Sequence, residues 1–362
     1  MPLWLKNECL KFGKGRHQLT KMKNRSKIKE VFFACFSLFG LFFSCFAQTA
    51  ETRRIAFYNV ENLFDTLDNP GTFDEDFLPG GFKKWNGVRL AVKRKRLYKV
   101  IASLGGEHPV AVLGLAEIET KKVLDDLICY TPLRRQGYQY IHFESPDRRG
   151  IDVALVFRTK DFTPLQTWPV PVSVGGSPKR DILYVMGRLG TDTLHIFVNH
   201  WTSRFGGHAQ TVEARKTFAR ILRREGEKLL RHNPEARIVF MGDFNDNPDD
   251  ESMLKVLGAL KRFSGADWIN LHFEAWDRGE RTLEHTSDGK LEPSLFDQLI
   301  VSRKAAESGR LKHAGIYAPD WLFRDGKIYR SYLGPTWKGG YSDHLPVFMD
   351  WEFTADSVFS FF

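Results

Sequence analysis

Short apolar runs recur along the chain from residue 50 onward, and most have the length of a β-strand. In several of them apolar and polar residues alternate, which is the pattern of a strand with one buried face. Others are apolar throughout, as in strands that are buried on both faces. The pattern predicts strands at Arg54–Val60, Val110–Ile118, Ile151–Arg158, Ile182–Leu189, Leu194–His200, Arg237–Phe244, Phe296–Ser302 and Pro346–Phe353.

Two longer stretches, Arg89–Leu104 and Ala209–Leu230, carry apolar residues three to four positions apart, which predicts amphipathic helices. Another helix is expected to begin at the acidic run Asp249–Glu251. Cys129 lies in a further apolar helical stretch and is expected to be a small buried side chain. Strands with interspersed helices predict an α/β body of one large domain, and so many strands favour two packed sheets.

The first 47 residues differ from the rest. Residues 1–30 carry nine Lys or Arg and two Glu, and Val31–Ala47 is an uncharged apolar run that ends in small residues. These are the parts of a secretory signal peptide, and the run is shorter than the ~20 residues that span a bilayer comfortably. We therefore expect residues 1–47 to be a basic leader with a signal peptide. We expect the protein to be exported to the periplasm, the cell surface or the medium.

Two other interpretations of the leader stay open. One is an N-terminal anchor that is not cleaved, and the other is a lipoprotein anchor at Cys45, although Phe42–Ser44 fits a lipobox poorly. Met22 is an alternative start. Three of the four cysteines lie in the leader, so the body holds Cys129 alone and has no intramolecular disulfide framework.

The formal net charge of +9 belongs largely to the leader. Residues 1–30 carry +7, which leaves +2 for the rest of the chain. A body so close to neutral has no duplex-wide electrostatic footprint for nucleic acid, although a local groove can still be positive. The hydrophobic (42%) and charged (27%) fractions are those of a globular protein. They exclude disordered, collagen-like and multi-span membrane architectures.

Polar side chains stand at the carboxyl ends of several predicted strands, where open α/β sheets build their sites. Taken singly, each has a plain structural alternative: a turn cap, a solvated strand end, a satisfied core histidine or an Asx-turn. Together they form one coherent set of carboxylates, amides and imidazoles. They lie in Asn59-Val60-Glu61-Asn62, Ala116-Glu117, Asn199-His200, Gly242-Asp243-Phe244-Asn245 and Tyr341-Ser342-Asp343-His344.

This set indicates metal-dependent hydrolysis of a phosphoester. Carboxylate and carbonyl oxygens suit a hard cation such as Mg²⁺, with Mn²⁺ or Ca²⁺ as alternatives. The sequence has no HExxH motif or Cys/His array for zinc, and no glycine-rich phosphate loop. A divalent ion beside a phosphate polarises the phosphoryl group, amides orient water or phosphate, and a His–Asp pair moves protons.

Six segments resemble, in order, the motif blocks of the endonuclease/exonuclease/phosphatase superfamily, which are deoxyribonuclease I-like metal-dependent phosphoesterases. The segments lie between Arg54 and Phe353 and read RIAFYNVENLFD, VLGLAEIE, FVNHWTSRFGG, IVFMGDFND, LFDQLIVS and GGYSDHLPV. The resemblance implies a four-layer α/β sandwich, with two packed mixed β-sheets flanked by helices and the site at one edge. It also implies that residues 48–362 form the catalytic domain.

The resemblance implies a role for each matching residue. Asp243 would activate or position the attacking water, Asn245 would hold the phosphate, and His344 would be the catalytic imidazole. The full set comprises Glu117 (the principal one), Glu61 and Asp343 as metal ligands, Asn59 and Arg204 as substrate contacts, and Asp243, Asn245, His200, His344 and Asp297 as catalytic residues.

Some positions keep alternatives or depart from the family pattern. Arg204 could equally be a solvated loop charge, and Asp147–Gly150 either lines the rim of the substrate site or forms a simple turn. Ala116 stands where many members of the superfamily have Gln before the metal-binding Glu. That departure leaves the ligand Glu117 itself in place.

We interpret the chain as an exported, divalent-metal-dependent phosphodiesterase, an endonuclease or exonuclease that hydrolyses nucleic-acid phosphodiester bonds. We expect a monomer without an obligate protein partner. A phospholipid or sugar-phosphate phosphoesterase is the alternative, although the sequence shows no unambiguous apolar hairpin for a membrane. A catalytically inactive binding protein on the same fold is less well supported, because it would lack a ligand or an imidazole and none is missing.

Overall fold

The computed structural model describes residues 50–262, 264–287 and 290–354, which all belong to one compact unit. The predicted leader and signal peptide, residues 1–47, lie outside the described residues. The cleavage site, the anchor alternatives and the division of the chain at residue 47 therefore stay predictions. In the part of the chain that is described, no helix combines the length and the apolar character needed to cross a membrane.

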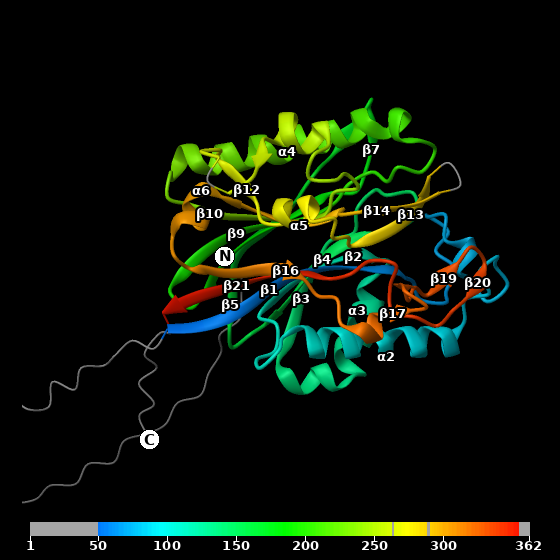
Figure 1. Ribbon diagram of the computed structural model, residues 1–362. Helices are drawn as coiled ribbons and strands as arrows, with labels where there is room; N and C mark the ends of the chain where they lie inside the picture. The colour runs from blue at the N-terminus through cyan, green and yellow to red at the C-terminus, as the bar shows by residue number, and fades with distance from the viewer. Residues whose placement is uncertain (1–49, 263, 288–289, 355–362) are drawn as a thin grey trace, which may run out of the picture. The chain divides into compact units, whose positions relative to one another are not determined.

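Two large mixed β-sheets form the centre of this unit (Figure 1). As far as the structure describes the chain, the first sheet has six strands, in the spatial order β16 (Leu311–Ile316), β21 (Val347–Thr354), β1 (Ala50–Leu63), β2 (Val112–Ile118), β4 (Asp152–Arg158) and β3 (Tyr138–His142). The second has seven described strands, in the order β11 (Ala259–Leu260), β12 (Trp268–Asn270), β15 (Asp297–Ser302), β10 (Arg237–Asp243), β9 (Asp192–His200), β8 (Ile182–Leu189) and β5 (Phe162–Val170).

Short hairpins and helices surround the sheets. The hairpins pair β6 (Ser173–Val174) with β7 (Ser177–Pro178), β13 (Leu283–Ser287) with β14 (Lys290–Ser294), β17 (Phe323–Arg324) with β18 (Lys327–Ile328), and β19 (Tyr332–Leu333) with β20 (Thr336–Trp337). The α-helices are α2 (Gly87–Leu104), α3 (Lys121–Cys129), α4 (His208–His232), α5 (Phe273–Asp277) and α6 (Arg303–Glu307). The shorter turns are η1 (Glu75–Phe77), η2 (Pro132–Gln136) and η4 (Asp320–Leu322), of the 3₁₀ type, and η3 (Ser252–Leu257), of the π type.

The layers follow from which face of each element is apolar. One buried cluster joins the outer face of the first sheet to α2 and α3, for example Tyr58 with Leu97 and Leu127. A second fills the space between the sheets, and a third joins the second sheet to Phe218 and Leu222 of α4. Figure 1 shows α4 above one sheet and α2 and α3 below the other. This arrangement confirms the predicted four-layer α/β sandwich with two packed mixed sheets flanked by helices.

The predicted strands are all present, with ends shifted by a few residues. The sequence pattern did not reveal β5, which carries Pro164 and Pro169 and is largely exposed. A strand at the edge of a sheet needs only one hydrogen-bonded side, so it tolerates proline and polar residues and has no clear apolar pattern.

The predicted helices are also present, but one prediction within them is wrong. Asn86 caps α2, because its side chain accepts hydrogen bonds from the backbone N–H groups of Val88 and Arg89. The acidic run at Asp249–Glu251 does precede a helical turn, although that turn is of the π type. Cys129 is exposed rather than buried, because it is the last residue of α3 and lies off the apolar face of that helix.

Candidate active site

Six strands bring the predicted site residues to one edge of the sandwich. β1 runs parallel to β2 with Asn59 opposite Ala116, and β9 runs parallel to β10 with His200 opposite Asp243. β15 is antiparallel to β10, so it begins at Asp297 where β10 ends at Asp243. Likewise β21 is antiparallel to β1, and the loop before it carries Asp343 and His344. We call this edge the strand-end site.

Asp243 lies at the centre of the strand-end site. Its Oδ2 atom accepts a hydrogen bond from Asn59 Nδ2 (3.0 Å) and lies 3.6 Å from His200 Nε2 and 3.8 Å from His344 Nε2. Its Oδ1 atom accepts from the backbone N–H of Asn245 at 2.9 Å. Burial, together with the nearby charge of Asp297, raises the pKa of Asp243 to about 7. This carboxyl group can therefore exchange a proton near neutral pH.

The pKa values of the two histidines of the site are shifted in opposite directions. Burial alone would lower the pKa of His344, but the charges of Asp297 and Asp243 raise it well above its ordinary value. His344 Nδ1 lies 2.7 Å from Asp297 Oδ2, which fixes the orientation of the ring. Burial, and then the charge of Arg180, lower the pKa of His200 well below its ordinary value. The site therefore pairs a charged imidazole with a neutral one.

Glu117 faces the same centre from the first sheet. Its Oε1 atom lies 3.3 Å from Asn59 Nδ2 and 3.9 Å from His200 Nε2, and its Oε2 atom accepts from the backbone N–H of Asn62 at 2.7 Å. The pairing of β2 with both neighbouring strands shifts register around Glu117. Such a bulge turns a side chain out of the regular ladder, here toward the site.

Glu61 and Asp343 form a second acidic group around the buried Lys93. The Glu61 carboxylate accepts from the backbone N–H groups of Ser331 (2.6 Å) and Tyr332 (3.0 Å) and lies 3.7 Å from Lys93 Nζ. Burial and the charge of Asp343 raise the pKa of Glu61. Burial alone would raise the pKa of Asp343 too, but His344 and then Arg330 hold it below its ordinary value.

The residues present fit a divalent metal ion. The charges of Glu61, Asp343 and Glu117 all act on the buried Lys93, and Arg330 pairs with Asp343, so three carboxylates face two cations. A hard divalent cation would relieve this excess of negative charge, and oxygen donors are the ligands that it prefers. Glu117 and Asp343 are the open members of the group, with side chains 14% and 20% exposed, whereas Glu61 is 4% exposed and already accepts two backbone hydrogen bonds. A group of Asp243, Asp297 and His344 atoms also lies within 4.8 Å of one another.

The Arg204 guanidinium is occupied by contacts with other residues of the chain. It donates to the backbone carbonyl of Asn245 (2.9 Å) and forms ion pairs with Asp246 (2.9 Å) and Asp250 (2.5 Å). It also lies over the ring of Phe296, 4.7 Å from the centroid. These contacts make Arg204 a support for the loop that carries Asn245, and its predicted contact with phosphate stays a prediction.

The backbone of the site is unusual where the proposed ligands stand. Glu61, Asn62, Glu117 and Asn245 all have positive φ, between 52° and 66°. Residues other than glycine adopt this region rarely and at a cost, and such positions concentrate at functional sites. Gly242 is required for a different reason, because a Cβ atom there would lie 2.4 Å from the Asn199 carbonyl oxygen. The glycine of the GDFN motif therefore allows β9 and β10 to approach beside Asp243.

Several residues of the site were not found from the sequence. Lys93 had a signal that could have revealed it, because it stands on the apolar face of α2 between Leu90 and Leu97. Arg180 had none, yet it donates to the carbonyls of His200 and Trp201, both at 3.0 Å. Arg330 donates to Asp343 Oδ2 at 2.5 Å, and no signal in the sequence pointed to it either.

Comparisons with known proteins bear on the fold and the family. No curated protein matches the chain. Among solved structures, TDP2 from D. rerio, complexed with a single-strand DNA product, is 15% identical with a TM-score of 0.53, covering 83% of this chain and 99% of its own. A mannosyl-6-phosphatase from Bacteroides thetaiotaomicron is 17% identical with a TM-score of 0.52, covering 83% of this chain and 100% of its own.

An endonuclease/exonuclease/phosphatase family protein, also from Bacteroides thetaiotaomicron, is 17% identical with a TM-score of 0.52 and covers 84% of this chain and 99% of its own. At these identities the similarity shows a shared fold. A sequence model named Endonuclease/Exonuclease/phosphatase family matches residues 54–352, which include the whole strand-end site. The chain therefore belongs to the endonuclease/exonuclease/phosphatase family of phosphoesterases.

Proposed function

We propose that this phosphoesterase is an exported, divalent-metal-dependent phosphodiesterase that hydrolyses nucleic-acid phosphodiester bonds. The observation that carries the proposal is the position of Asp243, whose carboxylate faces two imidazoles and the amide of Asn59. A water placed among these groups would meet a proton acceptor on one side and hydrogen-bond donors on the other.

Each residue has a part in this chemistry. Asp243, with its pKa near 7, takes the proton of the attacking water. The charged His344 and the neutral His200 offer N–H groups to the phosphate oxygens, where negative charge builds up in the transition state. Asp297 orients His344 through its 2.7 Å contact, and Asn59 and the backbone N–H of Asn245 hold the Asp243 carboxylate. The Asn245 side chain, which donates to the Trp201 carbonyl at 3.0 Å, would hold the phosphate through its remaining polar atoms.

Glu117 and Asp343 would hold the metal ion, with Glu61 behind them on the Lys93 side. The ion, which we propose to be Mg²⁺, would supply Lewis acidity toward a phosphoryl oxygen and neutralise charge on the leaving group. The residues of the chain contribute by keeping three carboxylates at one place before any substrate binds.

Nucleic acid is the substrate class that we favour. The D. rerio TDP2 structure, which has the same fold, was solved with a single-strand DNA product. Asp147–Gly150 forms a turn, and we assign its Arg149 to the rim of the site because it donates to the side chain of Asn62, one residue from Glu61. Cations at the rim suit a substrate with a charged backbone.

A phospholipid is the second candidate, and one residue favours it. Phe205 is 93% exposed and follows directly after Arg204, close to the loop that carries Asn245. An exposed aromatic side chain beside the site could enter a lipid surface or stack on a base.

A panel of substrates decides between these candidates. Plasmid DNA, RNA, a simple phosphodiester and a choline phospholipid would each be offered with Mg²⁺, to the wild type and to Asp243→Asn. We expect metal-dependent cleavage of nucleic acid by the wild type only. Turnover of the lipid alone would replace the proposed substrate, and no turnover of any of the four would contradict the proposal.

Export is also part of the proposal and rests on the apolar run Val31–Ala47. Mass spectrometry of the protein from the producing cells should give an N-terminus near Gln48. An intact leader on the mature protein would contradict cleavage, and a lipid-modified Cys45 would replace it with an anchor.

A further inference from the structure

A hollow of about 510 Å³ opens beside the strand-end site, and three hairpins contribute to its wall. It is lined by Asp343 of the site, by Glu284 of β13, and by residues of β17–β18, of β19 and of the segment after β20. We call it the hairpin hollow. Pockets of this size hold small organic molecules, of the order of a nucleotide.

The hairpin hollow carries positive charge that the protein itself does not neutralise. Of its acids, Asp343 pairs with Arg330 and Glu284 pairs with Arg281. Among the residues that the structure describes, its other cations form no ion pair with a carboxylate. These are Arg324, Lys327 and Lys338, and they face only Asp325 as a further acid of the lining.

Two of these cations are placed side by side by the β17–β18 hairpin. Arg324 and Lys327 are directly opposite each other across the two-residue turn Asp325-Gly326, where φ is +52° and +73°. Such a turn suits a tight hairpin. Like charges directly opposite each other destabilise a strand pair, so stability of the hairpin does not account for them. A ligand with negative charge would relieve the repulsion between them.

One of the cations, Arg324, is also held in place. The Arg324 guanidinium lies over the ring of Tyr329, 3.8 Å from its centroid, and Tyr329 Oη donates to the backbone carbonyl of Lys338 at 2.9 Å. Tyr329 therefore links both sides of the hollow. Ile328 and Leu333 add apolar surface to the same lining. A hollow with cations that are unpaired among the described residues, one of them fixed, and an apolar wall suits a phosphate joined to a nucleoside.

We propose that the hairpin hollow binds the nucleotide next to the scissile bond and holds its outer phosphate on Arg324, Lys327 and Lys338. The proposal rests on the proposed function and deepens it, because Asp343 belongs to both the hollow and the strand-end site. A substrate cleaved at the site would thus extend into the hollow with its neighbouring phosphate. The enzyme would prefer a dinucleotide with an additional phosphate to one without.

The test compares three dinucleotides in Mg²⁺: d(TpT), d(pTpT) and d(TpTp). We expect one of the two phosphorylated forms to have a KM about tenfold below that of d(TpT), as charge-assisted hydrogen bonds to phosphate would give. In the double variant Lys327→Gln/Lys338→Gln, the KM for d(TpT) divided by the KM for the preferred phosphorylated form should fall to near one. Lys304→Gln, far from the site, is the matched control and should keep the tenfold ratio.

Equal KM values for all three dinucleotides in the wild type would overturn the proposal. So would a preference that survives in the double variant, provided that its melting temperature matches that of the wild type. If the double variant folds poorly, the single substitution Arg324→Gln tests the same KM ratio, which should again fall toward one.

Binding separates this proposal from the proposed function. Calorimetry with the Asp243→Asn variant of the full chain measures the affinity for the same dinucleotides without turnover. About tenfold tighter binding of a phosphorylated form, lost on adding Lys327→Gln/Lys338→Gln, would support the hollow even if the wild type hydrolyses none of them. Equal affinities would reject the hollow while leaving hydrolysis of d(TpT) untouched.

Discussion

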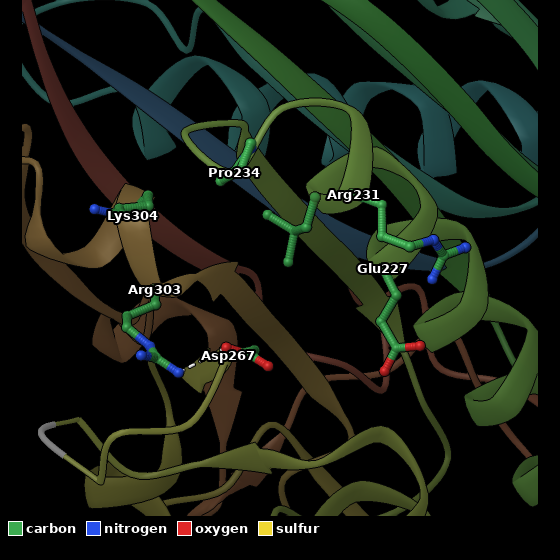
Figure 2. Close-up of a pocket in the computed structure, with 7 residues that line it drawn as sticks. Glu227, Arg231, Pro234, Asp267, Arg303 and Lys304 are labelled. Carbon is green, nitrogen blue, oxygen red and sulfur yellow. Dashed lines mark hydrogen bonds and ion pairs between the residues drawn. The ribbon is translucent and has the colours of Figure 1, made fainter.

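The two ends of strand β10 hold charge in different ways. β10 ends at Asp243 in the strand-end site, and it begins at Arg237, near a second hollow of about 430 Å³. Figure 2 shows this opposite hollow, with Arg303 and Asp267 joined in an ion pair of 2.6 Å. Lys304, which lines it too, pairs with Glu235 at 3.0 Å.

The difference is one of burial and neutralisation. In the opposite hollow, Arg303 and Lys304 lie near the surface and pair with acids of their own. In the strand-end site, carboxylates are buried beside one another and outnumber the Lys and Arg side chains that face them, and four residues have positive φ. Exposed ion pairs contribute little to stability and need no ligand, whereas crowded buried carboxylates are costly and mark function. A hollow alone is therefore a weak guide to the site.

The largest effect expected from this comparison is on catalysis. Asp243→Asn removes the proton acceptor at the centre of the site, so the turnover of a simple phosphodiester should fall by about 10³-fold or more. Asp267→Asn, which breaks the ion pair of the opposite hollow, should leave turnover within about twofold. Steady-state rates of the two variants measure this. Comparable losses in both would erase the distinction between the two ends of β10.

A large effect on stability is expected at Lys93. Its Nζ donates to Ser331 Oγ (2.6 Å) and to the Tyr341 carbonyl (2.8 Å) and lies beside Glu61. Lys93→Met would leave that carboxylate without its cation and should lower the free energy of unfolding by about 3–5 kcal/mol. Lys304→Met should change it by less than about 0.5 kcal/mol. Urea unfolding gives both values, and an unchanged stability for Lys93→Met would show that this lysine is dispensable.

The next effect is a pH dependence of stability that comes from His272, a buried histidine outside the strand-end site. Burial lowers the pKa of His272 to about 4, and its ring lies 3.2 Å from both the Leu299 N–H and the Gly315 carbonyl. In the unfolded chain His272 takes up a proton near pH 6.5, whereas in the folded chain it stays neutral down to about pH 4. The contribution of His272 to the free energy of unfolding is therefore fully present above pH 6.5. It should be lost toward pH 4, by up to about 1.4 kcal/mol per pH unit.

The matched variant is His272→Gln, which offers a donor and an acceptor but does not titrate. Its free energy of unfolding, measured between pH 7 and pH 4.5, should fall less steeply than that of the wild type. Parallel profiles for the two proteins would mean that His272 does not stay neutral in the folded state.

The smallest effect is expected at the rim. Arg149 donates to Asn62, whose backbone N–H in turn binds Glu117, so Arg149→Gln should raise KM for DNA about three- to tenfold. Arg148→Gln is the control, because Arg148 is a neighbouring exposed arginine that forms no ion pair in the described part of the chain. If the two variants behave alike, the rim acts by general charge and not through Asn62.

The sequence predicted which site residues lie at the ends of strands. Asn59, Glu117, His200 and Asp243 each follow an apolar run, and parallel pairing of those runs brings their ends together. The number of these runs also favoured two packed sheets. Such predictions need only local pattern and the geometry of a sheet.

Sequence reasoning failed where a contact joins distant segments. The Glu61 carboxylate binds the backbone of Ser331, 270 positions away, and Arg330 reaches Asp343 from a hairpin with no distinctive pattern. Arg204 was expected to contact phosphate or to be a solvated loop charge, and its ion pairs with Asp246 and Asp250 could not be predicted from the sequence. These outcomes depend on how loops pack, which local pattern does not encode.

The central claim is that the crowded carboxylates of the strand-end site require a divalent cation for hydrolysis of nucleic acid. The most direct test is the rate of plasmid nicking as Mg²⁺ is removed with EDTA and then restored, in the wild type and in Glu117→Gln. We predict that EDTA abolishes nicking, that Mg²⁺ restores it in the wild type, and that Glu117→Gln needs far more Mg²⁺ or stays inactive. Nicking at an unchanged rate in EDTA, or an identical Mg²⁺ dependence in both proteins, would contradict the account.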